Sequence, residues 1–105
     1  MERRLSIRKL IAHEVVLYCP GVGMLCCQVR DMSMDGVFLH IGQISIPTNT
    51  DVELAFNPRE EDRDEYNGPI RFGGHVVRSH TAGVGVNFTT FHDGAFAYLK
   101  RLIAD

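Results

Sequence analysis

Residues 24–40, MLCCQVRDMSMDGVFLH, contain two strand-like runs separated by a short polar turn. The first run extends to Met32, and the second, VFLHI, covers residues 37–41. Between them, DMSMDG (31–36) combines Asp and Ser side chains, which satisfy turn backbone, with Gly36, which is expected to supply a positive φ. These features predict a β-hairpin connected by residues 31–36.

Apolar, β-branched runs of similar length recur along the chain, at residues 11–19, 51–56, 70–80 and 84–90. Turn segments rich in Gly, Pro or Asn separate several of them. Within 70–80, the pair Gly73-Gly74 indicates a β-bulge or a tight bend. Six short strands at this spacing predict an all-β fold, either an antiparallel barrel or a sandwich.

The C-terminal segment follows a helical period instead. In HDGAFAYLKRLIAD, Phe96, Leu99 and Ile103 recur at spacings of three and four, and Leu102 lies beside this stripe. A helix over residues 92–104 is therefore predicted. Because so short a helix is unstable alone, its apolar face is expected to dock on the β-structure.

The length and composition indicate a single ordinary globular domain. The chain has 105 residues, of which 45% are hydrophobic and 23% charged, enough for one hydrophobic core. No apolar run approaches the roughly 18 residues needed to span a bilayer, so no membrane insertion is predicted. No apolar stretch typical of a secretory signal follows the basic start of the chain.

The three cysteines are Cys19, Cys26 and Cys27, which form no C-x-x-C pair. An odd number with two adjacent members makes a poor disulfide framework. Neighbouring residues of a strand point to opposite faces, so Cys26 and Cys27 are expected to pack separately. Reduced thiols and a cytoplasmic location are therefore predicted.

One loop carries most of the acidity. The segment NPREEDRDEYNGP (57–69) has five acidic residues and two arginines, a net −3, whereas the whole chain has −2, which leaves +1 for the rest. A solvated, mobile loop is the plain interpretation. No metal site is predicted, because nothing in the sequence makes these carboxylates converge as a divalent cation requires.

Positive charge, by contrast, is concentrated before the first strand. The start MERRLSIRK holds Arg3, Arg4, Arg8 and Lys9. Such an arm either keeps the terminus soluble or binds an anion. Its like charges and low apolar content predict mobility until an anion supplies the counter-charge.

The turn DMSMDG also permits a second interpretation, as a purine site. A carboxylate can accept two hydrogen bonds from the N1–H and N2–H₂ edge of guanine, and a hydroxyl can reach the ribose or N7. A glycine lets the backbone approach a ligand closely. Taken alone, this turn is as well explained by a hairpin connection.

Together, the arm and the turn carry a family resemblance. The arm contains R-x-x-x-R at Arg4 and Arg8, and the turn is D-x-S-x-x-G at Asp31, Ser33 and Gly36. In this order, with one strand-length between them, they resemble the PilZ domain, a bacterial cyclic di-GMP receptor. The ending GVGVNFTTF followed by a helix is similar to the way PilZ sequences close, so the resemblance covers essentially the whole chain.

The resemblance implies a fold: a six-stranded antiparallel β-barrel with a C-terminal α-helix. The chain is then one PilZ-like domain, with a flexible basic arm at 1–10, the barrel at 11–90 and the helix at 92–104. The ligand of such a domain sits on the barrel surface and is clasped by the arginine arm.

The resemblance also implies site residues. Arg4 and Arg8 are expected to bind the ligand from the arm, while Asp31, Ser33 and Gly36 hold one guanine and its ribose from the barrel. All five motif positions are intact. Position 35 departs mildly from the family, because it is Asp where many relatives have a small residue or glycine.

Two further arginines are assigned from the same resemblance. Relatives with a basic residue at the position of Arg3 tend to bind an intercalated ligand dimer, so two cyclic di-GMP molecules per chain are expected. Arg78 is expected either to stack on a base, as side chains near this position do in relatives, or to be an ordinary exposed strand residue.

The function expected from these residues is signalling rather than catalysis. Binding of cyclic di-GMP would order the arm and create a surface that an unidentified effector protein reads. No catalytic constellation, metal-ligand spacing or cofactor motif is found. Two other classes remain: a ligand-independent PilZ-type protein–protein interaction module, and a small barrel that binds single-stranded nucleic acid, which the net acidity disfavours.

Overall fold

A computed structural model describes residues 8–42, 44–66 and 68–104 of the chain, and most of these residues lie in strands. The elements, in chain order, are β1 (Lys9–Leu10), β2 (Glu14–Cys19), β3 (Gly23–Met32), β4 (Gly36–His40), β5 (Asp51–Phe56), the 3-10 turn η1 (Glu60–Asp62), β6 (Ile70–His80), β7 (Gly83–Phe91) and the helix α1 (Ala95–Ala104).

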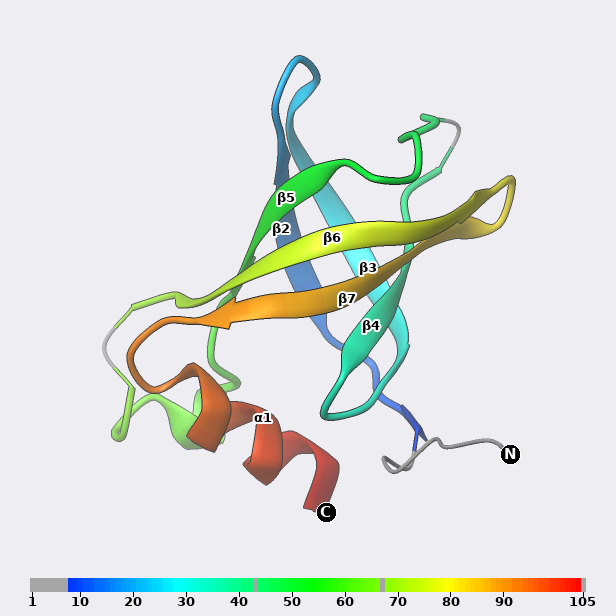
Figure 1. Ribbon diagram of the computed structural model, residues 1–105. Coiled ribbons are helices and arrows are strands. Elements are labelled where there is room, and N and C mark those ends of the chain that lie inside the picture. Colours follow the sequence, from blue (N-terminus) through cyan, green and yellow to red (C-terminus); the bar gives the residue numbers. More distant parts are fainter. Residues whose placement is uncertain (1–7, 43, 67, 105) are drawn as a thin grey trace.

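The strands form one antiparallel sheet that closes on itself. The strand order is β1-β3-β2-β5-β6-β7-β4, and an additional β3–β4 pairing joins the ends of the sheet. The result is a six-stranded closed barrel in which β1 is an extra strand on the lower part of β3 (Figure 1). The prediction of a six-stranded antiparallel barrel with a C-terminal helix is confirmed.

The barrel interior is filled from alternate positions of each strand. In β2, for example, Val15, Leu17 and Cys19 are buried, while Glu14 and Tyr18 are exposed. This period-2 alternation is what places one face of each strand in the core. Burial of apolar side chains along all six strands supplies the main stabilisation, at roughly 25 cal/mol per Å² of apolar surface.

Irregularities in pairing bend three places of the sheet. At the predicted place, between Gly73 and Gly74, the register does shift, but the extra residue is Thr89 of the facing strand β7. Two more shifts, between Val29 and Asp31 in β3 and between Val76 and Arg78 in β6, were not expected from the sequence. A bulge of this kind adds one residue to a strand and turns the side chains that follow it.

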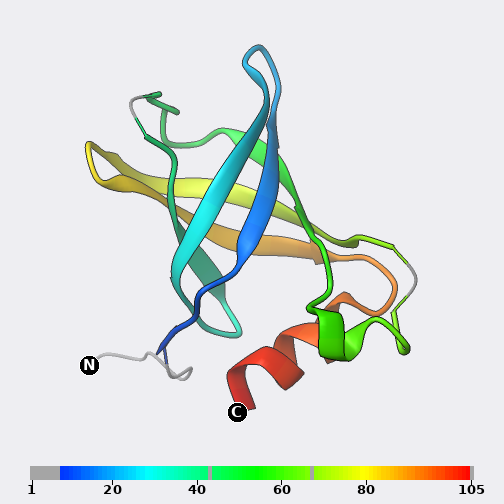
Figure 2. The same ribbon diagram turned by 180° about the vertical axis from the view of Figure 1, so that it is seen from behind.

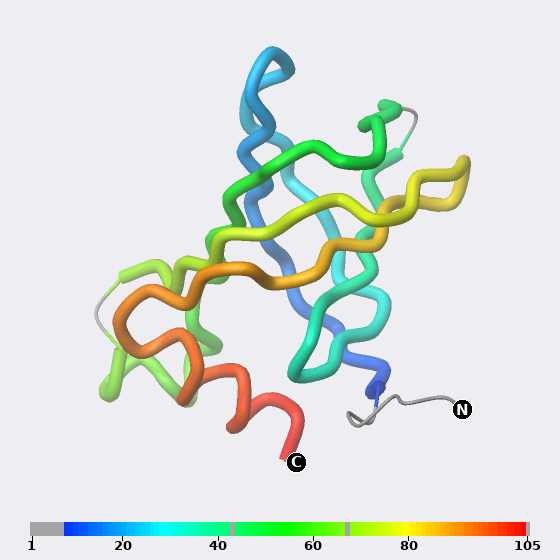
Figure 3. The backbone as a smooth tube through the Cα atoms, viewed as in Figure 1, coloured from blue at the N-terminus to red at the C-terminus, as the bar shows by residue number. Residues whose placement is uncertain are grey.

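The helix α1 packs across one end of the barrel, the same end at which the first described residues lie (Figures 1 and 2). The Lys9 ammonium donates a hydrogen bond of 2.9 Å to the Ile103 carbonyl in the last turn of α1. The tube in Figure 3 shows that the β2–β3 and β6–β7 hairpins extend toward the opposite end. None of the described helices is long and apolar enough to cross a membrane.

The buried face of α1 differs from the predicted stripe. Its buried residues are Ala95, Tyr98, Leu99 and Leu102, whereas Phe96 is 52% exposed. The helix begins at Ala95 rather than at residue 92, because Gly94, with φ of 80°, ends the turn that precedes it. The docked face follows the spacing of Ala95, Tyr98, Leu99 and Leu102, so it is centred on other residues than the predicted stripe.

The acidic loop is more ordered than the sequence suggests, so the prediction of a solvated, mobile loop is wrong for part of it. Asp62 is only 4% exposed, and its carboxylate lies 2.6 Å from Nε of Arg101 on α1. Glu65 also pairs with Arg101, at 2.6 Å. Two of the five acidic side chains of the loop, Asp62 and Glu65, are therefore paired with Arg101 of the helix.

Candidate functional site

The candidate site lies where the end of β3 meets β4 and the chain enters the barrel at β1. Asp31 pairs with Leu10 of β1 on one side and with Phe38 of β4 on the other. The register shift between Val29 and Asp31 makes Arg30 the extra residue of β3. As a result, two consecutive side chains, Arg30 and Asp31, line the same surface hollow.

The Asp31 carboxylate is held by two arginines. Nε and Nη2 of Arg8 both lie 2.7 Å from Oδ1, and Nε of Arg30 donates to Oδ2 at 2.9 Å. The Asp31 side chain is 12% exposed, compared with 28% for Arg8 and 48% for Arg30. A nearly buried carboxylate is thus covered by two partly exposed guanidinium groups.

The two arginines fix the charge state of Asp31. Burial by itself raises the pKa of the carboxyl group, but the hydrogen bonds and positive charges of Arg30 and Arg8 outweigh it. The pKa of Asp31 therefore lies below its ordinary value of 3.8. At neutral pH this group is an ionised acceptor.

Ser33 is buried beside this pair, at 1% exposure. Its hydroxyl oxygen accepts from Nη1 of Arg8 at 3.3 Å and from the Asp35 backbone N–H at 3.1 Å. The Ser33 backbone N–H in turn donates to the Gly36 carbonyl at 2.9 Å. Ser33 thus ties Arg8 to the β3–β4 turn and holds the turn itself together.

Gly36 has a different role from the one its place in a turn suggested. It is absent from the glycines with positive φ among the described residues, so that expectation is wrong. A Cβ at this position would run into the Val86 carbonyl oxygen and lie 3.1 Å from Cα of Asn87. Glycine is needed here because β4 and β7 approach closely.

Two surface hollows meet at this site. One, of about 350 Å³, is lined by Arg8, Arg30, Asp31, Phe38 and Arg78 together with Lys9 and Leu10. The other, of about 500 Å³, is lined by Arg8 and Arg78 again, and by Met34, Asp35, Asn87, Phe88 and Phe91. The two hollows therefore adjoin one another at a shared pair of arginines.

Arg78 reaches the site because of the second unexpected bulge. The register shift between Val76 and Arg78 sets Arg78 opposite Gly85 of β7. A Cβ on Gly85 would lie 3.5 Å from Nε of Arg78 and 3.8 Å from Cδ1 of Phe38. The Arg78 side chain thus lies across a glycine, next to the aromatic ring.

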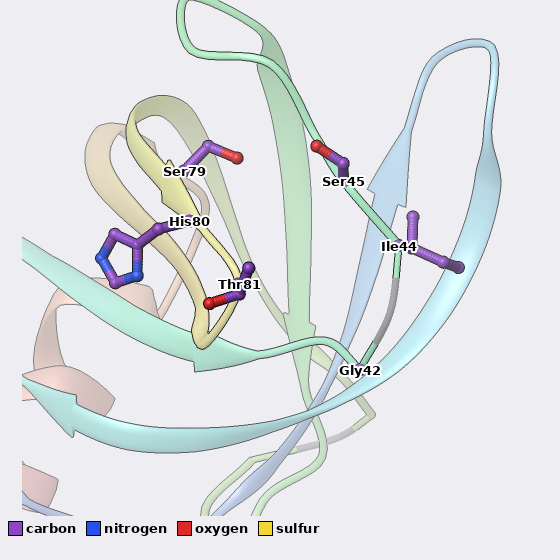
Figure 4. Close-up of a pocket in the computed structure, with 6 residues that line it drawn as sticks. All are labelled: Gly42, Ile44, Ser45, Ser79, His80 and Thr81. Carbon is purple, nitrogen blue, oxygen red and sulfur yellow. The ribbon is translucent and has the colours of Figure 1, made fainter.

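A further hollow, of about 520 Å³, lies at the other end of the barrel, between the β4–β5 connection and the β6–β7 hairpin (Figure 4). In this view the Ser45 and Ser79 side chains point toward one another and the His80 ring points away. The hollow shares no lining residue with the candidate site.

The predicted site residues fall into three groups. Arg8, Asp31 and Ser33 are in direct contact, and Gly36 and Arg78 lie beside them. Arg3 and Arg4 lie outside the described residues. In the described part of the chain, no three His, Cys, Asp or Glu side chains are grouped to hold a metal ion.

Two residues of the site were missed from the sequence, Arg30 and Phe38. Strict alternation along β3 places Arg30 opposite to Asp31, and only the bulge brings both to one side. Phe38 lies between Val37 and Leu39, which face the core, so its own ring faces outward. It is nevertheless only 3% exposed.

The chain is thus a closed barrel of six antiparallel strands with a C-terminal helix, and its outer surface carries a carboxylate held between two arginines. The family model described as PilZ domain matches residues 2–105. The chain belongs to the PilZ domain family, whose members are binding and adaptor modules and include cyclic di-GMP receptors.

Solved structures agree with this assignment at the level of the fold. The Bacillus subtilis inhibitor of motility, MotI/DgrA, superposes with a TM-score of 0.77 and 16% identity over 99% of this chain. The chain spans only about half, 51%, of that protein. The PilZ domain of CeSA from a cellulose-synthesizing bacterium superposes with a TM-score of 0.71 and 13% identity, covering 94% of this chain and 97% of that one. No curated protein matches the chain in sequence.

Proposed function

We propose that the chain is a cyclic di-GMP receptor and adaptor, in which Asp31 recognises a guanine edge and arginines of the arm bind the phosphates. The observation that carries this proposal is the contact between Asp31 and Arg8. An ionised, almost buried carboxylate in a surface hollow already accepts a forked pair of N–H donors from a flanking segment. The N1–H and N2–H₂ groups of guanine form a fork of the same kind.

In the proposed binding step, one pair of N–H donors on the Asp31 carboxylate is replaced by another. Guanine takes the place of the Arg8 guanidinium on the carboxylate, while Nε of Arg30 stays on Oδ2. Arg8 is then free to bind a ligand phosphate, to which its guanidinium is well matched. In this proposal Arg4 acts on the phosphates in the same way, and Ser33 donates to or accepts from the ribose or base.

Two ligand molecules per chain are proposed. The support is that two hollows adjoin one another and share Arg8 and Arg78, so two sets of bases could lie on either side of these cations. Guanidinium planes stack well on aromatic bases. Arg3, next to the R-x-x-x-R motif in the sequence, is proposed to neutralise the additional phosphates.

The adaptor role is proposed from the position of the arm. Once the arm is clasped over the ligand, the arm and the ligand together form a surface that an effector protein reads. The regulated process is proposed to be bacterial motility or biofilm formation. MotI/DgrA is described as an inhibitor of motility, which is consistent with this range of processes.

Isothermal titration with cyclic di-GMP tests the proposal. The wild type is expected to bind with a stoichiometry near two, and the Arg4→Ala, Arg8→Ala double variant to lose most of the affinity. Each charge-assisted hydrogen bond is worth roughly 1.5–3 kcal/mol, so the loss should be about a hundredfold or more. Arg71→Ala is the matched control, because Arg71 is exposed on β6 and lines neither hollow of the site.

The outcomes separate the two candidate functions. A double variant that binds as well as the wild type overturns the assignment of the arm. A wild type that binds no cyclic di-GMP favours the alternative, a ligand-independent PilZ-type interaction module. In that case the contacts of Arg8 and Arg30 with Asp31 would be the permanent state of the site.

A further inference from the structure

Arg30 is held in the candidate site by a carboxylate and by an aromatic ring. Its Nε donates to Oδ2 of Asp31 at 2.9 Å, and its Cζ lies 4.2 Å from the centre of the Phe38 ring. A guanidinium held on an aromatic face and on a carboxylate has little freedom to turn. Its side chain is still 48% exposed, and it lines the hollow beside Asp31.

Phe38 serves as the support for this cation. The ring faces outward from the barrel, yet Arg30 on β3 and His80 on β6 cover it, the latter with ring centroids 5.4 Å apart and an interplanar angle of 27°. An outward-facing phenylalanine that is 3% exposed adds nothing to the barrel interior. Its contacts instead fix the plane of Arg30.

The donors that Arg30 leaves unused are next to the acceptor used for guanine. No hydrogen bond to Nη1 or Nη2 of Arg30 is found within the described part of the chain, whereas Nε is on Asp31. Along the guanine edge the order of groups is N2–H₂, N1–H and then O6. If the Asp31 carboxylate accepts from N2–H₂ and N1–H, then O6 lies beside the Arg30 guanidinium, which flanks the carboxylate.

We propose that Arg30 is a specificity-determining residue of the site, which donates from its Nη groups to O6 of the guanine held by Asp31. This inference rests on the proposed function and adds a base-reading contact to it. Asp31 and Arg30 together then present an acceptor–acceptor–donor pattern. Guanine matches this pattern, and adenine, which has an amino group in place of O6 and lacks N1–H, does not.

The test compares three ligands on two variants by isothermal titration. Cyclic di-GMP has both the 2-amino group and O6, cyclic di-IMP has O6 but no 2-amino group, and cyclic di-AMP has neither. The variant Arg30→Met removes the donors and keeps an apolar side chain on Phe38. Arg71→Met is the control for loss of an exposed strand arginine.

Arg30→Met is expected to weaken the binding of cyclic di-GMP and of cyclic di-IMP by about tenfold or more each. The affinity for cyclic di-AMP should stay within about twofold of the wild-type value. The preference for guanine over adenine should therefore shrink by about tenfold, while Arg71→Met changes none of the three. An unchanged circular dichroism spectrum of Arg30→Met would show that any loss of affinity is not due to unfolding.

Two results overturn this inference alone: unchanged affinity of Arg30→Met for cyclic di-GMP, or an equal loss for all three ligands, which would assign Arg30 to the phosphates that they share. A wild type that binds none of the three overturns the proposed function, and this inference with it. The failure of one is therefore distinguishable from the failure of the other.

Discussion

Nε2 of His13 lies 2.9 Å from the hydroxyl oxygen of Tyr98, in the buried contact between the entry to β2 and the helix α1. Nδ1 of His13 is 2.7 Å from the Glu14 carbonyl and must donate to it, so Nε2 is an acceptor and the Tyr98 hydroxyl donates to it. The Arg59 backbone N–H donates to the same hydroxyl at 3.1 Å. This arrangement, in which the Tyr98 hydroxyl donates to Nε2, exists only while His13 is neutral, because an imidazolium has no acceptor nitrogen.

The stability of the protein should therefore decrease in mild acid. Burial, joined by the positive charge of Arg59, lowers the pKa of His13 below 6.5, against the opposing contributions of Glu14 and Asp62. The unfolded chain then binds a proton more readily than the folded one, so the contribution is complete above pH 6.5 and is lost as the pH falls through the lower native value.

Urea unfolding at pH 7.5, 6.5 and 5.5 measures this effect. His13→Gln should flatten the pH dependence, whereas His92→Gln, at a histidine side chain that is 46% exposed, should leave it as in the wild type. An equally steep decrease in His13→Gln would mean that another group is responsible.

Removal of the Tyr98 hydroxyl should destabilise the docked helix. Tyr98→Phe keeps the fully buried ring but leaves the buried His13 imidazole and the part-buried Arg59 N–H without their partner. The expected loss is about 1–3 kcal/mol in the free energy of unfolding. Tyr18→Phe is the matched control, because Tyr18 is 48% exposed on β2, and a loss of similar size there would contradict the explanation.

Gly36→Ala should lower the stability of the fold, because the new side chain would clash with the backbone of β7. The new Cβ would meet the Val86 carbonyl oxygen and Cα of Asn87, neither of which can rotate away. Overpacking of this kind costs typically 1–3 kcal/mol, which thermal unfolding would detect as a lower Tm. Gly85→Ala is the comparison, since its nearest neighbours would be at an ordinary 3.5 Å, and it should change the Tm less.

Asp31→Asn should weaken the binding of cyclic di-GMP while the fold is retained. An amide offers one acceptor in place of two and carries no charge, so a charge-assisted bond worth roughly 1.5–3 kcal/mol is lost, about tenfold to a hundredfold in Kd. The control is Asp51→Asn on β5, whose carboxylate is 88% exposed and pairs with His75 away from the site. Equal affinity of Asp31→Asn and the wild type would exclude Asp31 from the site.

Binding by the wild type should also be insensitive to mild acid. Because Arg30 and Arg8 hold the pKa of Asp31 below 3.8 despite its burial, the carboxylate remains ionised at pH 5. The dissociation constant for cyclic di-GMP is expected to be the same at pH 7 and pH 5 within about twofold, by titration at constant ionic strength. A marked loss between these values would mean that a group other than Asp31 controls binding.

The barrel could be predicted from the sequence because its strands alternate cleanly and are separated by turn residues. The alternation in β2 and the apolar run of β4 follow from local pattern alone. Arg8, Asp31 and Ser33 could be proposed together only from the order of two short motifs. Their contacts join residues more than twenty positions apart, which periodicity does not reveal.

The errors have a common physical cause, which is tertiary contact overriding local pattern. Charge composition predicted a solvated loop, but Arg101 on α1 orders Asp62 and Glu65. Apolar spacing predicted Phe96 as part of the docked face, but the face that packs on the barrel is Ala95, Tyr98, Leu99 and Leu102, and Phe96 lies beside it against Phe91. Gly36 was expected to adopt a positive φ in a turn, whereas it is needed because the backbone of β7 approaches closely.

The extra residue in β3 has a consequence for comparing this chain with its relatives. Removal of a single residue near Arg30 would restore regular pairing and send that side chain to the opposite face of the strand, with the neighbouring motif still intact. An arginine in the same alignment column of another PilZ domain is therefore equivalent to Arg30 only if that strand carries the same insertion. Counting columns alone would treat as equivalent two arginines whose side chains lie on opposite faces of the strand.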